Sequence, residues 1–555
     1  MRVLQLDVDR IEFELIEPEA EVYEKFQQNK ILLEDTLVLF VSIEEGDSEA
    51  MASRAVADAL EFCGKLKRNS ILIYPFAHLS SALEAPQRAM NLFNYMVKEA
   101  QKSALRVEHA PFGWNKRLSL DVKGHPLAEM SRSYGGTKPK KAEKKKVDLS
   151  IVRKSDWSYV PETDHRKIAE RLDLFSFQEV SPGMVYWHNN GHIILKELMS
   201  YIRKRLAESG YQEISTPAMA NTALWHVSGH IDHYRENMFI METNGQETGL
   251  RPMGCPFAIL VYKSKKHSYR DLPLRLAEFD KLYRNEISGS LSGLFRVREL
   301  TQDDAHLFMT EEQVEEELIK LLKLADEFYK KFGLEYKAKL STMPDDHMGD
   351  EKLWERATAS LKKALESNKI KYEIKEKEGA FYGPKIDIDV KDSMGRDWQC
   401  ATIQLDYQLP QRFGLSYTGE DGREHTPVIV HRAIYGSLER FIGIMIEHYQ
   451  GKFPTWISPI QAAIIPISEQ TNGYGRRLFE TISRSGVRAA LDDSDRTLNY
   501  KIKAAQDMKV PYMIILGKRE EDTDTISVRG RDGSQKHGIK IADFLDSIRK
   551  EIAEA

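Results

Sequence analysis

Residues 283–308 read YRNEISGSLSGLFRVRELTQDDAHLF, in which two alternating polar and apolar segments flank a loop rich in Gly and Ser. This pattern predicts a long β-hairpin. Because side chains alternate along a strand, one face of the second segment would carry a strongly polar set: Arg296, Arg298, Gln302, Asp304 and His306. The first segment adds Arg284 and Glu286. Such a face is either open to water or lines a ligand pocket. Arginines on it suit bidentate phosphate binding, although surface salt bridges are an equally good explanation.

The chain on either side of this hairpin shows three kinds of pattern. Residues 156–455 alternate long helical patterns with consecutive extended segments. Strands that follow one another without an intervening helix favour an antiparallel sheet with helices packed on it. Residues 1–136 and 456–555 show short apolar strands separated by amphipathic helices. We therefore expect a multidomain α/β protein, with the antiparallel sheet domain between two smaller α/β domains.

A lysine-rich segment, residues 137–155, separates the first two of these domains. From Lys138 to Lys146 it contains six lysines against one glutamate, and no apolar side chain larger than that of Ala142. A segment of this composition cannot bury a core, so we expect a linker. It is either a solvated tether or a tether that also touches RNA phosphates.

The amino-acid composition indicates the cellular compartment in which we expect the protein. Of 555 residues, 41% are hydrophobic and 30% are charged, which is typical of a soluble globular protein. We find no signal peptide and no apolar run long enough for a membrane helix, and the few cysteines favour a reducing compartment. We therefore expect a cytoplasmic protein without a membrane partner. The formal net charge of −5 does not decide for or against a nucleic-acid partner, because phosphate contacts depend on local patches.

One cysteine, Cys255, lies in the segment GLRPMGCPFAIL, far from the other two, Cys63 and Cys400. This spacing excludes a disulfide framework and a paired CxxC zinc motif. Taken alone, an isolated cysteine is more often a small buried apolar residue than a ligand. For Cys63 and Cys400 we expect packing roles only, whereas the residues alone leave the role of Cys255 open.

Three motifs give this chain a family resemblance. YRNE with the downstream FRVRELTQDDAH resembles motif 2 of the class II aminoacyl-tRNA synthetases, and HRAIYGSLERFIGIMIEHY resembles motif 3, with Gly436 and Arg440. EISTPAMANTALWHVSGH, centred on Pro217, resembles motif 1. With RPMGCP, SYRDLPLRLAEF and GAFYGPKIDI, the chain resembles the threonyl-tRNA synthetases in particular, nearly end to end through the catalytic and C-terminal domains. The resemblance implies a class II antiparallel core, activation of L-threonine with ATP, transfer to tRNA(Thr), and a homodimer built through motif 1.

The resemblance also implies a catalytic zinc ion, one per subunit, held by Cys255, His306 and His431. Three protein ligands leave a fourth position open, as in catalytic rather than structural zinc sites. In this family the amino and hydroxyl groups of threonine both coordinate the metal. Valine lacks the hydroxyl, and a site built around a substrate hydroxyl rejects such an analogue by roughly 10⁴–10⁵. On this interpretation Cys255 is a ligand.

Roles for other polar residues come from the same resemblance. It implies that Arg284 and Arg296 hold the α-phosphate of ATP and that Arg440 holds the γ-phosphate, with Mg²⁺ accompanying ATP. Glu286 is implied to read the adenine, and Gln302 to contact ATP. The amino-acid pocket is implied to contain Asp304, Tyr382, Lys385 and Gln404. A role in transfer to tRNA is implied for His230, although a lone histidine is often structural.

A second active site is expected because serine shares both the hydroxyl and the amine of threonine. One methyl group discriminates by only about 10–200-fold. YPFAHLSS, APFGWNKRLSL and KGHPLAEMSR resemble the editing domain of archaeal-type threonyl-tRNA synthetases, which is similar to D-aminoacyl-tRNA deacylases. Carried over by position, His78, Lys116 and Glu129 line that pocket, with surface ion pairs as the alternative role. Asn115 stands where the family has an aromatic residue.

The last domain, residues 456–555, resembles the α/β anticodon-binding domain of several class II synthetases. Glu520 and Arg529 match its pattern, whereas Asp495 and Lys503 stand where we expect Asn and Arg. Arginine has a planar fork that lysine lacks, so contacts at Lys503 differ from those of the family.

Three other functions remain to be weighed. A seryl- or prolyl-type synthetase is disfavoured by the set Cys255, His306 and His431. A non-catalytic RNA-binding regulator on a synthetase fold is disfavoured because Arg284, Arg296 and Arg440 are all present. The N-terminal domain is either an editing domain or a structural one.

Overall fold

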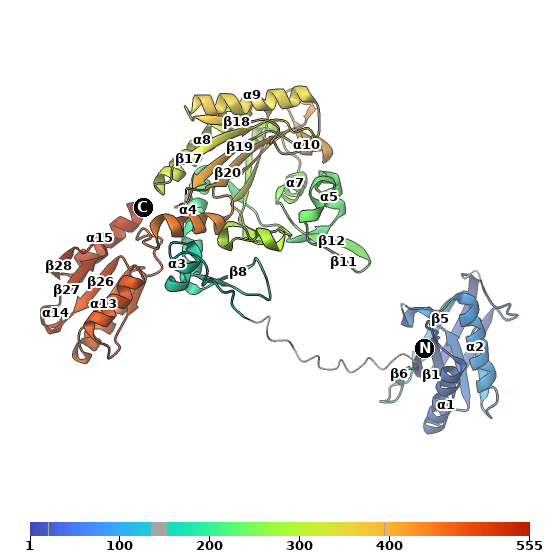
Figure 1. The fold of residues 1–555 in the computed structure, drawn as a ribbon. Helices are drawn as coiled ribbons and strands as arrows, with labels where there is room; N and C mark the ends of the chain where they lie inside the picture. Colours follow the sequence, from blue (N-terminus) through green and yellow to red (C-terminus); the bar gives the residue numbers. More distant parts are fainter. Residues whose placement is uncertain (20–21, 81, 135–152, 393–394, 555) are drawn as a thin grey trace. The chain divides into compact units, whose positions relative to one another are not determined.

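The computed structural model describes residues 1–19, 22–80, 82–134, 153–392 and 395–554 (Figure 1). The chain divides into two compact units, Met1–Asp148 and Leu149–Ala555. Most of the predicted linker, residues 137–152, lies outside the described residues. Among the helices that are described, none is both long and apolar enough to cross a bilayer.

The first unit is a mixed six-stranded sheet with two helices. The strands run in the order β4-β3-β2-β1-β5, and β6 also pairs with β1. Their bounds are Arg2–Pro18 (β1), Lys30–Ser42 (β2), Ser70–Pro75 (β3), Arg106–His109 (β4), Trp114–Val122 (β5) and Glu129–Ser133 (β6). Helices α1 (Glu49–Leu66) and α2 (Pro86–Ala100) pack their apolar stripes with one face of the sheet in a common core. A second apolar cluster covers the other face, where Phe13, Phe40 and Tyr74 are buried.

The centre of the second unit is an eight-stranded sheet in the order β18-β17-β19-β20-β23-β16-β13-β9. All pairs in this sheet are antiparallel except β17 with β18 and β13 with β9. The strand bounds are Gln212–Glu213 (β9), Leu274–Glu278 (β13), Asp304–Met309 (β16), Tyr336–Ser341 (β17), Tyr372–Lys375 (β18), Lys385–Lys391 (β19), Asp397–Asp406 (β20) and Val428–Ala433 (β23).

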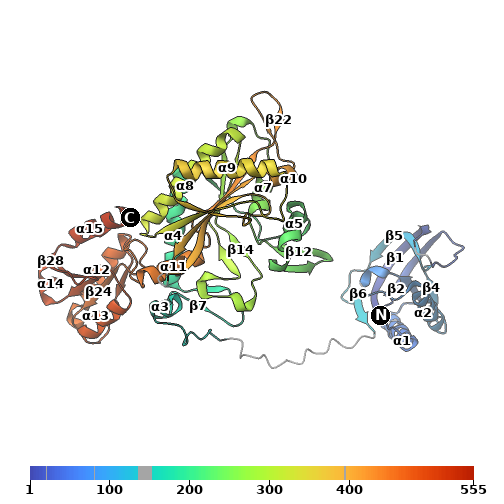
Figure 2. The ribbon, with the colours of Figure 1, turned by 45° about the horizontal axis from the view of Figure 1, so that its top comes forward.

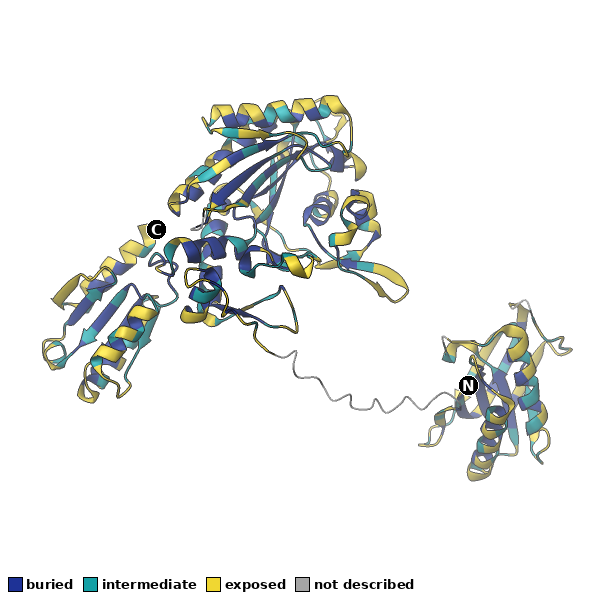
Figure 3. Cartoon of the chain, in the orientation of Figure 1, coloured by how far each residue is buried: buried dark blue, intermediate teal, exposed yellow. Residues whose placement is uncertain are grey.

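Helices cover one face of this sheet. They are α3 (His165–Leu172), α4 (Asn189–Glu208), α8 (Val314–Lys331), α9 (Glu351–Ser367) and α11 (Leu438–Tyr449). Apolar residues alternate toward them along each central strand, as with Leu307, Ile403 and Val430 in the main core. The helices show buried inner and exposed outer surfaces in Figure 3, and Figure 2 gives a turned view of the sheet. Because side chains alternate, the polar residues of the same strands share the opposite face.

Short elements border that opposite face. They include α5 (Ala223–Ser228), α6 (His230–Tyr234), α7 (Cys255–Lys263), α10 (Gln408–Arg412), the strands β14 (Lys281–Tyr283) and β15 (Glu299–Thr301), and the 3₁₀ turn η6 (Gly293–Phe295). A further small sheet, β10-β12-β11, is formed by Met219–Asn221, Gln246–Leu250 and Ile240–Thr243. Two-stranded sheets are formed by β7 (Phe175–Phe177) with β8 (Val185–Trp187), and by β21 (Tyr417–Thr418) with β22 (Glu424–His425).

The hairpin predicted for residues 283–308 is only partly formed. β14 and β15 do pair, but Arg296 and Arg298 precede β15, and β16 belongs to the large sheet. The prediction of one continuous polar strand face is therefore wrong. The strand is interrupted at Gln302 and Asp303, and the buried Asp303 carboxylate accepts hydrogen bonds from the backbone amides of Ile434 and Tyr435, both at 2.9 Å.

The C-terminal part of the unit is a five-stranded sheet in the order β25-β24-β26-β27-β28. Its strands are Ala462–Pro466 (β24), Ala489–Leu491 (β25), Tyr512–Leu516 (β26), Ile526–Gly530 (β27) and Gln535–Ile539 (β28). Its helices are α12 (Asn472–Arg484), α13 (Leu498–Asp507), α14 (Lys518–Thr523) and α15 (Ile541–Glu554). Apolar residues of α12 and α15 share one core with the sheet, and those of α13 share another, so helices cover both faces.

Candidate active site and metal centre

The polar face of the large sheet forms the floor of a cavity of about 360 Å³. Most of the residues predicted to bind ATP or the amino acid line it: Arg284, Glu286, Arg296, Gln302, Asp304, Tyr382, Gln404 and Arg440. Segments far apart in the sequence therefore meet here. Of the remaining predicted residues, Cys255 and His431 also line the cavity, whereas His306, His230 and Lys385 do not.

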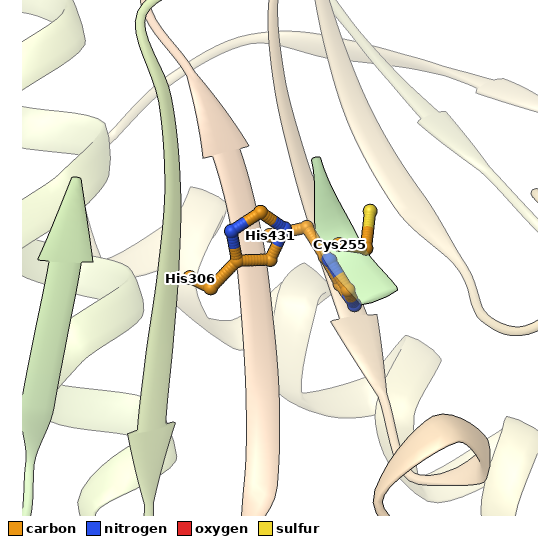
Figure 4. Close-up of side chains that lie close together, drawn as sticks. All are labelled: Cys255, His306 and His431. Carbon is orange, nitrogen blue, oxygen red and sulfur yellow. The ribbon is translucent and has the colours of Figure 1, made fainter. Parts of the chain in front are cut away.

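Three possible metal ligands come together where Cys255 and His431 line this cavity, and Figure 4 shows their side chains close to one another. Cys255 is the first residue of α7, and His306 and His431 are register partners on β16 and β23. One ligand atom from each lies within 4.8 Å of the others, and all three residues are buried. His306 Nε2 and His431 Nδ1 are buried without a hydrogen-bond partner among the described residues. Since buried polar atoms are normally bonded, these two nitrogens are suited to binding an ion.

Asp406 fixes the orientation of His431. The Nε2 atom of His431 lies 2.8 Å from Asp406 Oδ2, so its N–H donates to this carboxylate and Nδ1 is left for a ligand. Asp406 is itself held by the backbone amides of Gln408 and Leu409, at 2.7 and 3.0 Å from Oδ1. A carboxylate behind a histidine ligand is the usual arrangement at zinc sites.

The electrostatics of the cluster favour a thiolate. Burial alone would disfavour it, but the positive charges of His431 and His306 outweigh burial and hold the pKa of Cys255 at about 7. Burial also opposes charge on His431, and the neighbouring Cys255 and Asp406 raise its pKa to about 10. A thiolate next to two imidazoles is the mixed donor set that zinc accepts.

The other end of the cavity is cationic. Arg284, Arg296 and Arg440 all border it, and burial lowers the pKa of Arg440, with Arg284 and Arg296 adding to the effect. Glu286 pairs with Arg296 at 2.9 Å. Arg440 donates to the carbonyl oxygens of Phe295 and Gln399, at 3.0 and 2.7 Å, which fixes its guanidinium. Three arginines around one carboxylate suit a polyanionic ligand.

Between the arginines and the metal cluster lie the residues predicted for the amino-acid pocket. Tyr382 donates a short hydrogen bond to Gln404, and Asp304 lies with its Oδ2 3.8 Å from His306 Nε2. Burial raises the pKa of Asp304 to about 6, so it remains largely ionised at neutral pH. Lys385 instead pairs with Asp387 at 2.8 Å. Asp304, Tyr382 and Gln404 line the cavity, whereas Lys385, the register partner of Gln404 on β19, lies beside this group without lining the cavity.

His230 is completely buried behind the cavity. Its Nδ1 lies 2.8 Å from Ser228 Oγ, and its Nε2 lies 3.1 Å from the sulfur of Met253, which does line the cavity. Burial, together with His431, lowers the pKa of His230 to about 3. The imidazole is therefore neutral at physiological pH and separated from the cavity by Met253.

Comparisons with known proteins follow the same division of the chain. Family models match residues 1–134 as the "Archaea-specific editing domain of threonyl-tRNA synthetase", 237–449 as the "tRNA synthetase class II core domain (G, H, P, S and T)", and 461–551 as an "Anticodon binding domain". A solved structure described as the RNA binding domain of threonyl-tRNA synthetase from Cryptosporidium parvum Iowa II is 40% identical, with a TM-score of 0.69, over 70% of this chain and 98% of that one.

The chain belongs to the threonyl-tRNA synthetase family. Curated relatives named "Threonine--tRNA ligase" are 51% identical over 392 residues in Thermotoga neapolitana and 49% over 424 residues in Petrotoga mobilis. The two matches cover 70% and 76% of this chain, but only 61% and 65% of those relatives. A putative threonyl-tRNA synthetase from Aeropyrum pernix is 28% identical, with a TM-score of 0.62, over 70% of this chain and 96% of that one. The family resemblance and the predicted fold class, a class II core with editing and anticodon-binding domains, are confirmed.

The editing unit of this family member holds a second cavity, of about 370 Å³. His78 and Lys116 both line it, with the aromatic residues Tyr74, Phe76 and Trp114. The amine of Lys116 donates to the carbonyl of Trp114 at 2.9 Å and lies 5.0 Å from the centre of the Tyr74 ring. Burial lowers the pKa of Lys116 to about 8. Asn115 is exposed and also borders the cavity.

Glu129, the third residue predicted for this cavity, does not lie in it. On β1, Glu129 pairs with Leu6 while Lys116 pairs with Leu15. Nine residues of strand span about 30 Å, so the two side chains of one chain are far apart. The prediction that Glu129 lines the same pocket within this chain is wrong, because β5 and β6 pair with opposite ends of the long strand β1.

The predicted anticodon residues lie on the C-terminal sheet and its helices. Glu520 accepts from Ser527 at 2.8 Å and from the Gly517 amide at 2.9 Å. Arg529 has a buried Nε without a hydrogen-bond partner in the described part of the chain. Lys503 is exposed and pairs with Asp507, and Asp495 is exposed.

Two contributors to the site were missed by the sequence analysis. Asp406 stands two residues after Gln404 on β20, so strand alternation could have placed it on the same face. The aromatic pair Phe295 and Trp398, stacked at 4.4 Å beside Arg440, carries no comparable signal because its members are distant in sequence.

Proposed function

We propose that this chain activates L-threonine with ATP, transfers it to tRNA(Thr), and hydrolyses mischarged seryl-tRNA(Thr) in its N-terminal unit. The observation that carries this proposal is the convergence of three arginines and the Cys255, His306 and His431 cluster on one cavity. A cationic end suits the triphosphate and a metal end can hold the amino acid, so one pocket can bring together the two substrates of adenylate formation.

Zn²⁺, one per chain, is the ion that best fits the cluster, with Cys255 Sγ, His306 Nε2 and His431 Nδ1 as ligands. Two buried imidazole nitrogens without partners, a thiol with a lowered pKa and a carboxylate behind His431 support this assignment. When bound, the ion supplies a Lewis-acid position that an amine and a neighbouring hydroxyl can reach together. That chemistry separates threonine from valine.

The chain's own residues orient the two substrates. Arg284 and Arg296 neutralise the α-phosphate, so that it can approach the carboxylate of the amino acid, while Arg440 holds the γ-phosphate and Mg²⁺ accompanies ATP. Glu286 reads the adenine and Gln302 contacts ATP. The Asp304 carboxylate accepts from the substrate ammonium group, and Tyr382 with Gln404 completes the pocket. His230 supports transfer to tRNA only as a neutral, buried group.

The remaining assignments concern RNA, assembly and location. Glu520 and Arg529 contact anticodon bases, as expected for unstacked bases read at their edges. The family match supports a homodimer and tRNA(Thr) as the RNA partner, and a cytoplasmic location agrees with the composition. His78 and Lys116 hold the seryl ester and a water in the editing cavity.

Amino-acid-dependent ATP–pyrophosphate exchange tests this proposal. Exchange with threonine, weaker exchange with serine and none with valine is expected, because valine cannot offer a hydroxyl. Vigorous exchange with valine would contradict the metal assignment. Absence of exchange with all three amino acids would favour a non-catalytic RNA-binding regulator on the same fold.

A further inference from the structure

A second buried cluster of possible metal ligands lies outside the cavity. Asp164, His165 and Glu447 place one ligand atom each within 4.8 Å of the others, and all three are buried. His165 Nδ1 lies 2.9 Å from Glu447 Oε1, and its Nε2 lies 3.0 Å from the backbone nitrogen of Leu294. Both ring nitrogens are therefore engaged, which leaves none for an ion.

The bonding pattern indicates which tautomer of the His165 ring fits its partners. Since the Leu294 amide can only donate, Nε2 is the unprotonated nitrogen and accepts, while Nδ1–H donates to the Glu447 carboxylate. The Glu447 carboxylate also accepts from the backbone amide of His165 at 3.2 Å. Hydrogen bonds at both nitrogens fix the orientation of the ring, so a segment packed against the ring is fixed as well.

The turn η6, Gly293–Phe295, packs directly against the His165 ring. The turn approaches so closely that a Cβ on Gly293 would lie 2.2 Å from His165 Nε2, and Gly293 has a φ of +51°. The ring of Phe295 packs edge-on against His165, with centroids 4.4 Å apart. No side chain larger than hydrogen fits at Gly293 without moving the turn off the histidine.

The same turn leads directly into the cationic end of the cavity. Arg296 follows Phe295 in the chain, and Arg440 donates to the Phe295 carbonyl at 3.0 Å. The Phe295 ring stacks on Trp398 with planes 12° apart, and the Arg440 guanidinium lies 5.7 Å from the Trp398 ring. A displacement of η6 would therefore move two of the three arginines.

We propose that His165 is a positioning residue for ATP binding, which seats η6 so that Arg296 and Arg440 face the triphosphate. It acts through Leu294 and Phe295 and does not line the cavity itself. His165 belongs to α3, outside the residues matched by the class II core model. The inference deepens the proposed function and rests on it.

Two substitutions of His165 test its two side-chain hydrogen bonds separately. His165→Asn keeps an amide near Nδ1 for Glu447 and loses the acceptor for Leu294, whereas His165→Gln places its amide near Nε2 and keeps that acceptor. We expect His165→Asn to raise the KM for ATP in threonine-dependent exchange by about tenfold, since small misplacements of binding groups are costly. The KM for threonine should change less than twofold. His165→Gln should restore most of the ATP affinity.

A matched control is His188, a neighbouring histidine whose nitrogens lie 2.6 Å from Asp173 and 3.0 Å from Ser176. His188→Asn should leave both KM values unchanged. A second approach from the turn itself is Gly293→Ala, which should raise the KM for ATP without touching the histidine. Combined with His165→Asn it should add little, because both act on the same contact.

Binding of ATP alone, measured by equilibrium dialysis on the full chain, keeps this test separate from the proposed function. If the wild type binds ATP but shows no exchange, the proposed function fails while the dissociation constants of the variants still test the positioning role. Equal losses for ATP and threonine, or a lower Tm with unchanged ATP affinity in His165→Asn, would overturn the inference.

Discussion

The cavity beside the metal cluster in the second unit and the cavity of the first unit have nearly the same volume, about 360 and about 370 Å³, but differ in how their polar groups are held. Cys255, His306 and His431 are at most 6% exposed, and both histidines are on central strands. His78 is exposed on a 3₁₀ turn, and Lys116 lies near the start of β5. The proposed functions fit this difference, because selection by metal coordination needs fixed donors whereas hydrolysis needs access for water and an ester. The two cavities therefore differ in the burial of their polar groups and not in size.

The largest expected effect on activity comes from removing one of the three buried metal ligands. Cys255→Ala should abolish stoichiometric zinc binding and reduce threonine-dependent exchange by more than about 100-fold, because two histidines alone leave the ion with too few ligands. Zinc content measured by atomic emission, together with exchange rates, checks this.

Cys63→Ala is the matched control for loss of a thiol. Cys63 is equally buried, but burial raises its pKa to about 12, and it packs in the core of the editing unit. It should leave zinc content and exchange unchanged. Full zinc content in Cys255→Ala would contradict the assignment of this residue as a ligand.

A smaller effect is expected from the carboxylate behind His431. Asp406→Asn keeps the size of the side chain but weakens acceptance from His431, so zinc affinity should fall by about 10–100-fold. Competition with a chromogenic chelator measures this. Asp350→Asn is the control, since Asp350 also accepts a backbone amide two residues ahead, that of Lys352, at the start of α9. Unchanged affinity in Asp406→Asn would mean that the ring of His431 is oriented by other contacts.

Sequence patterns predicted the fold class well because each domain repeats its own periodicity. Gln404 and His431 were assigned by the family resemblance alone, and their pairing on β20 and β23 is what places both on one face of the sheet. Strand alternation failed at residues 283–308, where the strand is interrupted between β15 and β16. Asp303, at this interruption, is held by amides of residues 434 and 435, more than 130 positions away, and no local pattern contains that information.

Site residues could be predicted where they belong to a sequence motif. They could not be predicted where their role depends on contacts between segments that are distant in sequence. His165 reaches Leu294 and Glu447 across 129 and 282 residues, so its role emerges only from the fold. Glu129 was wrongly predicted for a different reason. Its motif match implied that it lies close to His78 and Lys116, but the register of β6 on β1 places it far from Lys116. Lys385 matches its motif and lies beside Gln404, but its amine pairs with Asp387 and does not line the cavity.

In the cavity of the first unit, we expect a moderate effect that is confined to the hydrolysis of seryl-tRNA. Replacing His78 and Lys116 together by Ala and Met should lower seryl-tRNA hydrolysis by at least about tenfold, with threonine activation unchanged because the two cavities share no residues. Deacylation of preformed seryl-tRNA measures this. Hydrolysis at the wild-type rate would make the N-terminal unit structural.

Glu129→Gln is the informative companion of this double variant. If Glu129 stays where β6 places it, hydrolysis should change less than about twofold, the usual range for an exposed side chain away from a site. A loss as large as that of the double variant would show that Glu129 reaches the editing cavity of another chain.

The smallest effect is on stability and comes from Lys116 alone. Its folded-state pKa of about 8 lies below the ordinary value of 10.5, so between these values the unfolded chain binds more protons and stability rises with pH. Below pH 8 the amine is charged in both states, and its partial burial then destabilises the fold. Lys116→Met should therefore raise the Tm of the editing unit by roughly 2–5 °C at pH 7, and by much less at pH 10.5.

Lys123 supplies a control of opposite sign within the same unit. It pairs with Asp35 and Asp9, which raise its pKa, so its contribution to stability is present below pH 10.5 and is lost only as the pH rises through the folded-state value. Lys123→Met should lower the Tm at pH 7 where Lys116→Met raises it. Calorimetry of the full chain at the two pH values measures both variants. If Lys116→Met lowers the Tm at pH 7, as Lys123→Met is expected to do, burial of the Lys116 amine does not destabilise the fold.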